Sequence, residues 1–280
     1  MEPVTAPLAF LSRLPLYTYQ KPYIVIPPKG SGEKPAEQRR LENLEFSQVP
    51  VIINDMRMRK ESSLSVNGFQ KFDHPFGPFD LDEASVLAYR GQTESILREI
   101  LDAEAYRRNS PLEVLELDVN DPLLVEGPPT GVHDLTYDHA PKILRTLLKE
   151  HGKAQYLKPG SRIRVVNTWR PMVSKLEDRP LAFCDFRTVD PNDAIPTDRV
   201  YPHRSTELYY FHHNENQRWY WLPGQTPDET LMMLMYDTHP DGGAEYCPHV
   251  SFPNPLAAAD APPRESVETR SIVITRASVA

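Results

Sequence analysis

The stretch from Arg162 to Pro171 combines a strand pattern with side chains that could do chemistry. Its first half alternates apolar residues onto one face of an extended chain, and it ends with an amide, an indole and a guanidinium at Asn167, Trp169 and Arg170. An apolar strand that leads into a flat hydrogen-bonding cluster predicts the wall of a binding pocket. The alternative is a strand end at which Trp169 packs in the core and Arg170 pairs with a surface acid.

Composition excludes several classes of partner. The net charge of −8 argues against a nucleic acid or an anionic membrane surface. No apolar run approaches the ~20 residues of a membrane span, and the first residues lack the pattern of a secretory signal. Cys184 and Cys247 are too few for a disulfide framework and lack the spacing of zinc ligands. We therefore expect a cytoplasmic protein whose partners are small molecules.

The elements that must position these side chains are mostly strands. The 29 prolines disfavour an all-helical fold and suit short strands joined by turns. Helical spacing of apolar residues predicts one helix that is capped by Asp80 or Asp82 and ends near Arg107, and a second from Ala140 to about His151. Strand patterns are predicted at Val51–Ile53, Leu112–Leu117, Ser161–Thr168, Leu181–Phe186, Glu207–Phe211, Arg218–Leu222, Leu231–Tyr236 and Ser271–Thr275.

Early helices and regularly spaced late strands indicate one α+β domain built on a sandwich or barrel-like β core. Residues 1–50 are interrupted by prolines and are predicted to form an arm that packs on the body. Residues 51–280 are predicted to form a single catalytic domain. The oligomeric state is open, although an arm of this length could reach a second subunit of a homodimer.

Five segments in order carry a family resemblance that extends from about Val51 to Ile274. They are Asn167–Pro171, Arg218–Trp221, Tyr236–Asp237, Pro248–Phe252 and Pro263–Arg270. In this arrangement the chain resembles the AsaB-type hydroxylase/desaturase family, which includes the cephem methoxylase-related and gibberellin desaturase-like proteins of secondary metabolism. The resemblance implies a double-stranded β-helix (jelly-roll or cupin-like) core flanked by helices, as in iron(II)/2-oxoglutarate oxygenases.

In such an oxygenase a His-x-Asp pair and a distant histidine hold iron on one face and leave other positions open. His249 lies where the resemblance places the distant histidine, and Arg264 or Arg270 could grip a carboxylate of 2-oxoglutarate. The first motif departs from the family, because His133 and Asp134 are adjacent. Neighbours on a regular strand point to opposite faces, so this pair can chelate one metal only if a β-bulge turns both to the same side. The adjacent Asp138 and His139 repeat the problem.

A family fold with a compromised metal site favours chemistry without a cofactor. The resemblance extends to the hetero-Diels–Alderases of tropolone sesquiterpenoid pathways, and it implies dehydration of a hydroxymethyl tropolone to a quinone methide that adds to a sesquiterpene such as humulene. This reaction needs an acid, donors to the tropolone oxygens and a dry apolar wall. Orientation of the two reactants alone could supply about 7–11 kcal/mol.

The predicted site therefore contains two groups of side chains. The candidate catalytic residues are His133 and His249 as acids, with Asn167, Arg170 and Arg264 as donors. The candidate substrate-binding residues are Asp134, Thr136, Trp169, Tyr209, Trp219, Phe252 and Arg270. For each aromatic residue the alternative is simple core packing, and for Arg264 it is a surface pair with Glu268.

Three hypotheses remain open at this point. The preferred one is a cofactor-independent hetero-Diels–Alderase that contains no metal. The second is an iron(II)/2-oxoglutarate-dependent hydroxylase or desaturase in which a bulged His133–Asp134 pair and His249 hold the iron. The third is a non-catalytic protein that binds a hydrophobic small molecule. Dependence of turnover on iron distinguishes the first two hypotheses.

Overall fold

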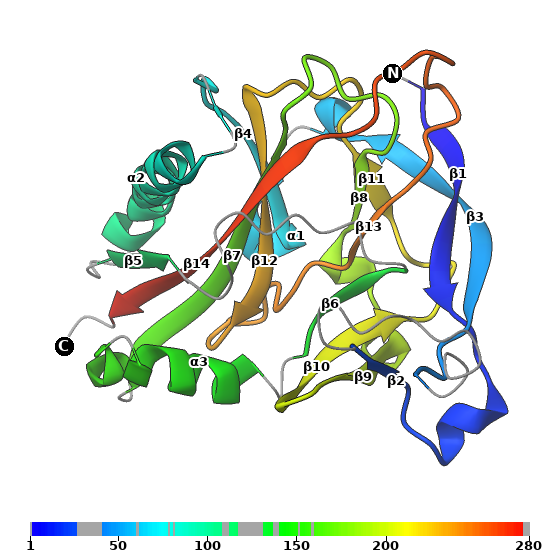
Figure 1. Ribbon diagram of the computed structural model, residues 1–280, viewed down its shortest axis with the longest axis horizontal. Coiled ribbons are helices and arrows are strands. Elements are labelled where there is room, and N and C mark those ends of the chain that lie inside the picture. Colours follow the sequence, from blue (N-terminus) through cyan, green and yellow to red (C-terminus); the bar gives the residue numbers. More distant parts are fainter. Residues whose placement is uncertain are drawn as a thin grey trace.

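Two β-sheets face each other across the main hydrophobic core of the protein (Figure 1). The computed structural model describes residues 2–26, 41–59, 62–77, 79–80, 82–107, 112–116, 131–136, 140–150, 152–157 and 160–276. The strands are β1 Val4–Leu11, β2 Tyr23–Val25, β3 Phe46–Asp55, β4 Phe69–Asp73, β5 Leu112–Glu116, β6 His133–Leu135, β7 Ser161–Pro171, β8 Leu181–Cys184, β9 Ala194–Tyr201, β10 Arg204–Phe211, β11 Trp219–Trp221, β12 Glu229–Asp237, β13 His249–Ser251 and β14 Ser266–Arg276. The helices are α1 Leu64–Asn67, α2 Glu83–Arg107 and α3 Ala140–Glu150.

The larger sheet has nine strands in the order β1-β3-β11-β8-β13-β6-β10-β9-β2, and the smaller has five in the order β4-β12-β7-β14-β5. The nine-stranded sheet curls, so that β1 packs over β10 and β13 and closes a second core on the far face of that sheet. The five-stranded sheet presents Ile163, Val165 and Ile272 to the core between the sheets. Helix α3 adds Leu144 and Leu148 to this core.

Helix α2 covers the outer face of the five-stranded sheet, where Leu97 and Leu101 pack on Val166 and Val273 (Figure 1). The carboxylate of Asp82 accepts a hydrogen bond from the backbone N–H of Ser85 (2.7 Å), which caps the start of this helix. The predictions of helices ending at Arg107 and beginning at Ala140 are therefore confirmed. The eight predicted strands also form, as β3, β5, β7, β8, β10, β11, β12 and β14.

Three strands contain prolines in their interior. Pro7 of β1 lies directly opposite Pro50 of β3. Strand β1 is an edge strand, and Pro50 precedes the part of β3 that pairs with β11. Pro196 of β9 likewise precedes the residues that pair with β2. At each proline the strand pairs with a neighbour on one side only, so the missing proline N–H does not disrupt the sheet. The division of the chain into an arm and a catalytic domain at about residue 50 stays a prediction.

None of the helices among the described residues has the length and apolar character needed to span a membrane. The cytoplasmic location stays a prediction.

Candidate active site

Two histidines meet on neighbouring strands of the nine-stranded sheet. His133 of β6 and His249 of β13 are directly paired across the ladder, and their ring centroids lie 4.8 Å apart. Directly opposite residues of an antiparallel pair share a face, so both imidazoles point to the same side of the sheet. Phe183 of β8 is paired with His249 and belongs to the core between the sheets. The two imidazoles therefore face the five-stranded sheet.

Both imidazoles are oriented by the same local contact. Nδ1 of His133 lies 3.0 Å from the carbonyl oxygen of Gly131, and Nδ1 of His249 lies 2.9 Å from that of Cys247. Because a carbonyl oxygen only accepts, each Nδ1 carries the proton and each Nε2 keeps its lone pair. The lone pairs of two imidazoles are thus available to one shared ligand.

The protonation of these histidines is set by burial. Burial, together with the neighbouring His249, lowers the pKa of His133 from 6.5 to about 3. Burial also lowers the pKa of His249, against the hydrogen bond to Cys247. Both rings are therefore neutral at neutral pH, which is the state of a metal-ligating histidine. A neutral ring protonated at Nδ1 has no proton at Nε2 to give as an acid.

Asp134 points to the opposite face of β6. It is paired with Tyr209 of β10, it is 1 % exposed, and its Oδ2 accepts a hydrogen bond from the backbone N–H of Cys247 (2.7 Å). The register of β6 on β10 runs without a shift through His133, Asp134 and Leu135, so the bulge considered from the sequence does not occur in this pairing. The described residues contain no group of three His, Cys, Asp or Glu side chains that could hold a metal. Asp138 and His139 lie outside the described residues.

The wall that faces the histidines comes from β7 and β14. Asn167 is fully buried and is paired with Arg270, whose Nε donates to Asn167 Oδ1 (3.0 Å). The amide of Asn167 donates in turn to Glu268, and both charged residues are exposed. Glu268 raises and Arg270 lowers the pKa of His249, although less than burial does, so this polar ladder lies within electrostatic reach of the imidazole. The site is therefore open to solvent along β14.

Arg264 extends this wall. Its Nη1 donates to Ser251 Oγ (3.0 Å) and to the carbonyl oxygen of Arg179 (3.3 Å), and its guanidinium lies 5.9 Å from the centre of the Trp169 ring. Ser251 is two residues from His249 on β13 and so projects from the same face. Trp169 is paired with Glu268 and belongs to the core between the sheets. Both of these hydrogen bonds from Arg264 are made to neutral oxygens, beside the aromatic surface of Trp169.

The structure does not bring the remaining predicted residues to the histidines. Arg170 lies between Phe76 and Tyr89 under α2, and its Nη1 donates to the carbonyl oxygens of His74 and Pro227. Thr136 donates to the carbonyl oxygen of Glu207 (3.3 Å). Three aromatic residues belong to the core on the far face of the nine-stranded sheet: Tyr209, Trp219 and Phe252. Their roles in catalysis or binding stay predictions.

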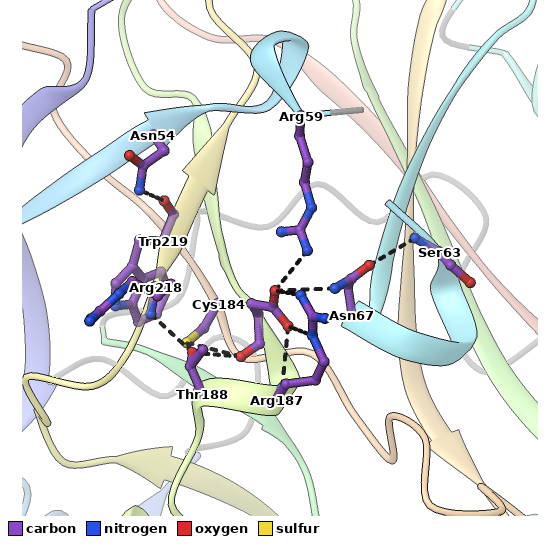
Figure 2. A network of polar contacts seen from close by, with 10 residues as sticks. Asn54, Arg59, Ser63, Asn67, Cys184, Arg187, Thr188, Arg218 and Trp219 are labelled. Atoms are coloured by element: carbon purple, nitrogen blue, oxygen red, sulfur yellow. Dashed lines mark hydrogen bonds and ion pairs between the residues drawn. The ribbon is translucent and has the colours of Figure 1, made fainter. Parts of the chain in front are cut away.

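Sequence reasoning missed Ser251 and Glu268, which lie two residues from His249 and Arg270. The period of two along a strand is the signal that places each beside its predicted neighbour. It also missed a buried polar cluster around Asp185, shown in Figure 2. The Asp185 carboxylate accepts hydrogen bonds from Arg59 (2.8 Å), Arg187 (2.7 Å) and Asn67 (3.1 Å).

The cluster around Asp185 joins the turn after β3 and the nearby helix α1 to the turn after β8, which is more than 100 residues further along the chain. Burial alone would raise the pKa of Asp185, but the hydrogen bonds from Arg187, Arg59 and Asn67 outweigh it and lower the pKa to about 2. Asp185 stays ionised at neutral pH and acts as a structural anchor.

The fold is that of an iron-dependent oxygenase. It resembles a variant of the iron and alpha-ketoglutarate-dependent endoperoxidase NvfI with a TM-score of 0.76 at 23% identity, over 98% of this chain and 97% of that one. The prediction of a double-stranded β-helix (jelly-roll or cupin-like) core with flanking helices is confirmed by this likeness. Residues 17–274 match the family described as an oxidoreductase/YMDC permease-like domain, and the chain belongs to this family.

Proteins related in sequence include named hydroxylases/desaturases. The hydroxylase/desaturase efuI of Hormonema carpetanum is 30% identical over 257 residues, which are 82% of this chain and 85% of the relative. The hydroxylase/desaturase asaB of Aspergillus flavus is 29% identical over 127 residues, 40% of this chain and 56% of the relative. The resemblance to the AsaB-type hydroxylase/desaturase family is therefore confirmed.

One expectation is overturned by the relatives. The Fe(II)/2-oxoglutarate-dependent dioxygenase nvfI of Aspergillus novofumigatus is 37% identical over 117 residues, 40% of this chain and 41% of the relative. Relatives of this kind use iron and 2-oxoglutarate, and the prediction of a protein that needs no cofactor is wrong on this finding. The prediction relied on the adjacency of His133 and Asp134. That adjacency concerns only whether the carboxylate can bind the metal, and the two imidazoles remain paired in the structure.

Proposed function

We propose that the protein is an iron(II)/2-oxoglutarate-dependent oxidoreductase that hydroxylates or desaturates a small molecule of secondary metabolism. The observation that carries the proposal is the pairing of His133 with His249, with both Nδ1 atoms turned back to carbonyl oxygens. Both rings face a wall that holds Arg264 and Arg270. The family membership favours the same activity.

The two imidazoles fit iron. They are neutral at neutral pH, they lie on adjacent strands, and the hydrogen bond at Nδ1 fixes the tautomer that leaves Nε2 free to coordinate. When bound, iron with 2-oxoglutarate supplies the oxidising power to break an unactivated C–H bond. His133 and His249 would hold the iron, and their rings would not take part in proton transfer.

Asp134 does not fit as the third ligand. Its carboxylate lies on the other face of β6 and accepts the N–H of Cys247. The described residues therefore supply two of the three protein ligands of a facial triad. We assign no further ligand and no reaction step to the metal.

Arg264 suits a carboxylate of 2-oxoglutarate. Its Nη1 donates to a hydroxyl and to a carbonyl oxygen, and a charged carboxylate can replace these contacts with a stronger bidentate pair. Arg270 is engaged with Asn167 and stands beside Glu268 on an exposed stretch of β14. We propose that Arg264 binds the cosubstrate, while Asn167, Glu268 and Arg270 orient polar groups of the substrate. Trp169 supplies an apolar surface for its hydrocarbon part.

The test uses iron and 2-oxoglutarate without the substrate. Purified protein in the presence of oxygen should form succinate from 2-oxoglutarate only when iron(II) is added. His133→Ala and His249→Ala should each lower this rate by at least about 100-fold, because even changes behind the metal ligands cost 10–100-fold. Arg264→Ala should raise the 2-oxoglutarate concentration needed for half-maximal rate. His239→Ala, in an exposed loop after β12, is the matched control and should leave the rate unchanged.

Succinate formation that is independent of iron, or unchanged in both histidine variants, would refute the proposal. The hetero-Diels–Alderase activity and the binding of a tropolone and a sesquiterpene stay predictions, since no contact among the described residues favours them. The hydrophobic substrate, the lack of nucleic acid or membrane partners, and the homodimer likewise stay predictions.

A further inference from the structure

The backbone of Cys247 is held on both sides of its Cα. Its N–H donates to Oδ2 of Asp134 (2.7 Å), and its carbonyl oxygen accepts from Nδ1 of His249 (2.9 Å). Asp134 is 1 % exposed and the Cys247 side chain is fully buried. The carboxylate on one face of the sheet is thus connected through the backbone of one residue, Cys247, to the imidazole on the other face.

The backbone conformation of Cys247 orients the His249 ring, because the carbonyl oxygen of Cys247 accepts from His249 Nδ1. Cys247 lies at the end of the loop from β12 to β13 and precedes Pro248, which restricts the backbone of Cys247 and has no N–H of its own. The carbonyl oxygen of Pro248 accepts from the backbone N–H of Cys184 (2.8 Å), which fixes the far side of the proline. Asp134 fixes the backbone N–H of Cys247, before the proline. A rotation of the Cys247 backbone would move its carbonyl oxygen, which is the acceptor of His249 Nδ1, away from the ring.

The equivalent contact at His133 is made by a glycine. The carbonyl oxygen of Gly131 accepts from His133 Nδ1, and Gly131 has a φ of 85°, which is a left-handed conformation. There the backbone itself turns the carbonyl oxygen toward the ring. At Cys247 no left-handed residue is present, and a side chain supplies the anchor instead.

We infer that Asp134 is a positioning residue for His249: it holds the backbone N–H of Cys247, so that the carbonyl oxygen of the same residue stays aimed at His249 Nδ1 and His249 presents Nε2 beside His133, and it does not bind the metal itself. The inference rests on the proposed function, in which His249 binds iron. It predicts that the hydrogen-bond acceptor at position 134 matters and that its charge does not.

Two substitutions separate these roles. Asp134→Asn keeps an oxygen that can accept the Cys247 N–H, but an amide is a poor replacement for a carboxylate ligand. Asp134→Ala removes the acceptor. Titration of the full chain with cobalt(II), followed by its absorption, should give an affinity within about 3-fold of wild type for Asp134→Asn and a loss of about 10–100-fold for Asp134→Ala. His249→Ala should show the larger loss expected of a ligand.

The matched control is Asp185→Asn. Asp185 is also buried and also accepts a backbone N–H, from Arg187, but it accepts its other hydrogen bonds from the side chains of Arg187, Arg59 and Asn67. This variant should lower the unfolding temperature without changing cobalt affinity. A general loss of stability and a specific loss of positioning are thereby distinguished.

A second measurement needs no metal. Nitrogen NMR of the imidazoles should show His249 protonated at Nδ1 in wild type and in Asp134→Asn, and a mixture of tautomers in Asp134→Ala. If Asp134→Asn loses cobalt as His249→Ala does, Asp134 is a ligand and the inference is wrong. If wild-type His249 carries its proton at Nε2, the inference is also wrong. If cobalt does not bind wild type, the proposed function fails, while the tautomers still decide whether Asp134 positions His249.

Discussion

The two faces of strand β6 have opposite characters. On one face His133 lies beside His249 and faces a wall that carries the exposed charged residues Glu268 and Arg270. On the other face Asp134 lies in a closed aromatic core with Tyr209 and Tyr246, whose ring centroids are 5.6 Å apart. Burial and the nearby Tyr209 raise the pKa of Tyr246.

The difference teaches that two neighbouring residues with metal-binding side chains can have unrelated tasks. Alternation along the strand separates them by the thickness of the sheet. His133 remains accessible to a ligand, while Asp134 is committed to a backbone N–H inside the protein. The contrast predicts that substitutions on the aromatic face act on stability and that substitutions on the histidine face act on ligand binding.

The largest expected effect is on the aromatic face. Phe211 is fully buried and packs on Tyr246 with ring centroids 5.8 Å apart. Phe211→Ala should lower the free energy of unfolding by about 3–5 kcal/mol, because it leaves a cavity in a closed core. Arg270→Ala on the exposed face should change it by less than about 1 kcal/mol. Urea unfolding of both variants measures the difference.

Phe211→Leu is the control, since it keeps part of the volume and should lose less stability than Phe211→Ala. The folded fraction of each Phe211 variant should bind cobalt(II) as wild type does. A change in affinity comparable to that of His249→Ala would contradict the separation of the two faces.

The next effect concerns the turn that orients His133. Gly131 has a φ of 85°, and a Cβ built there would lie 2.3 Å from the ring of Phe46. Gly131→Ala should lower the free energy of unfolding by about 2–3 kcal/mol, from left-handed strain and the displaced ring together. It should also weaken cobalt binding, because the carbonyl oxygen of Gly131 holds the His133 ring.

Gly152→Ala is the matched control for this substitution. Gly152 is also left-handed, with a φ of 66°, but a Cβ there meets nothing within 4 Å. It should show the strain alone, about 1–2 kcal/mol, and unchanged cobalt affinity. Equal effects of the two substitutions on both measurements would show that the turn at Gly131 has no special role.

The sequence contained the period of the strands but not their register. Alternation predicts that His133 and Asp134 point apart, and the structure has this arrangement. The same rule separates Asn167 from Arg170, three residues apart on β7, yet both were assigned to one pocket because the residue types suggested hydrogen-bonding donors. Attention to position along the strand would have removed Arg170 from that group.

The meeting of His133 and His249 could not be predicted from local patterns. It depends on the pairing of two three-residue strands that are far apart in the chain, and β13 follows Pro248 and shows no alternation long enough to recognise. The resemblance to a known family, and not the periodicity, singled out His249. Alternation along a strand could have placed Ser251 beside His249 and Glu268 beside Arg270, but the meeting of these two pairs in one site depends on register.

The smallest effect is a pH dependence that belongs to the histidine face. An unfolded histidine binds a proton below a pH of about 6.5, whereas burial lowers the pKa of folded His133 to about 3. The unfolded state therefore binds more protons between these values, and stability falls as the pH falls through this window. Each such histidine should cost up to about 1.4 kcal/mol per pH unit below 6.5. Urea unfolding at pH 7.5, 6.5 and 5.5 measures the slope.

His133→Gln should reduce this slope, and His133→Gln with His249→Gln should reduce it further, because burial lowers the pKa of His249 as well. The aromatic face offers no such dependence in this range. Asp185, with a pKa lowered to about 2, contributes stability that is complete above a pH of about 4 and is lost only below it. Burial also lowers the pKa of His212, so part of the slope should remain in the double variant. A slope between pH 6.5 and 5.5 that is the same in wild type and in the double variant would show that the two imidazoles are not the neutral, buried pair on which the site depends.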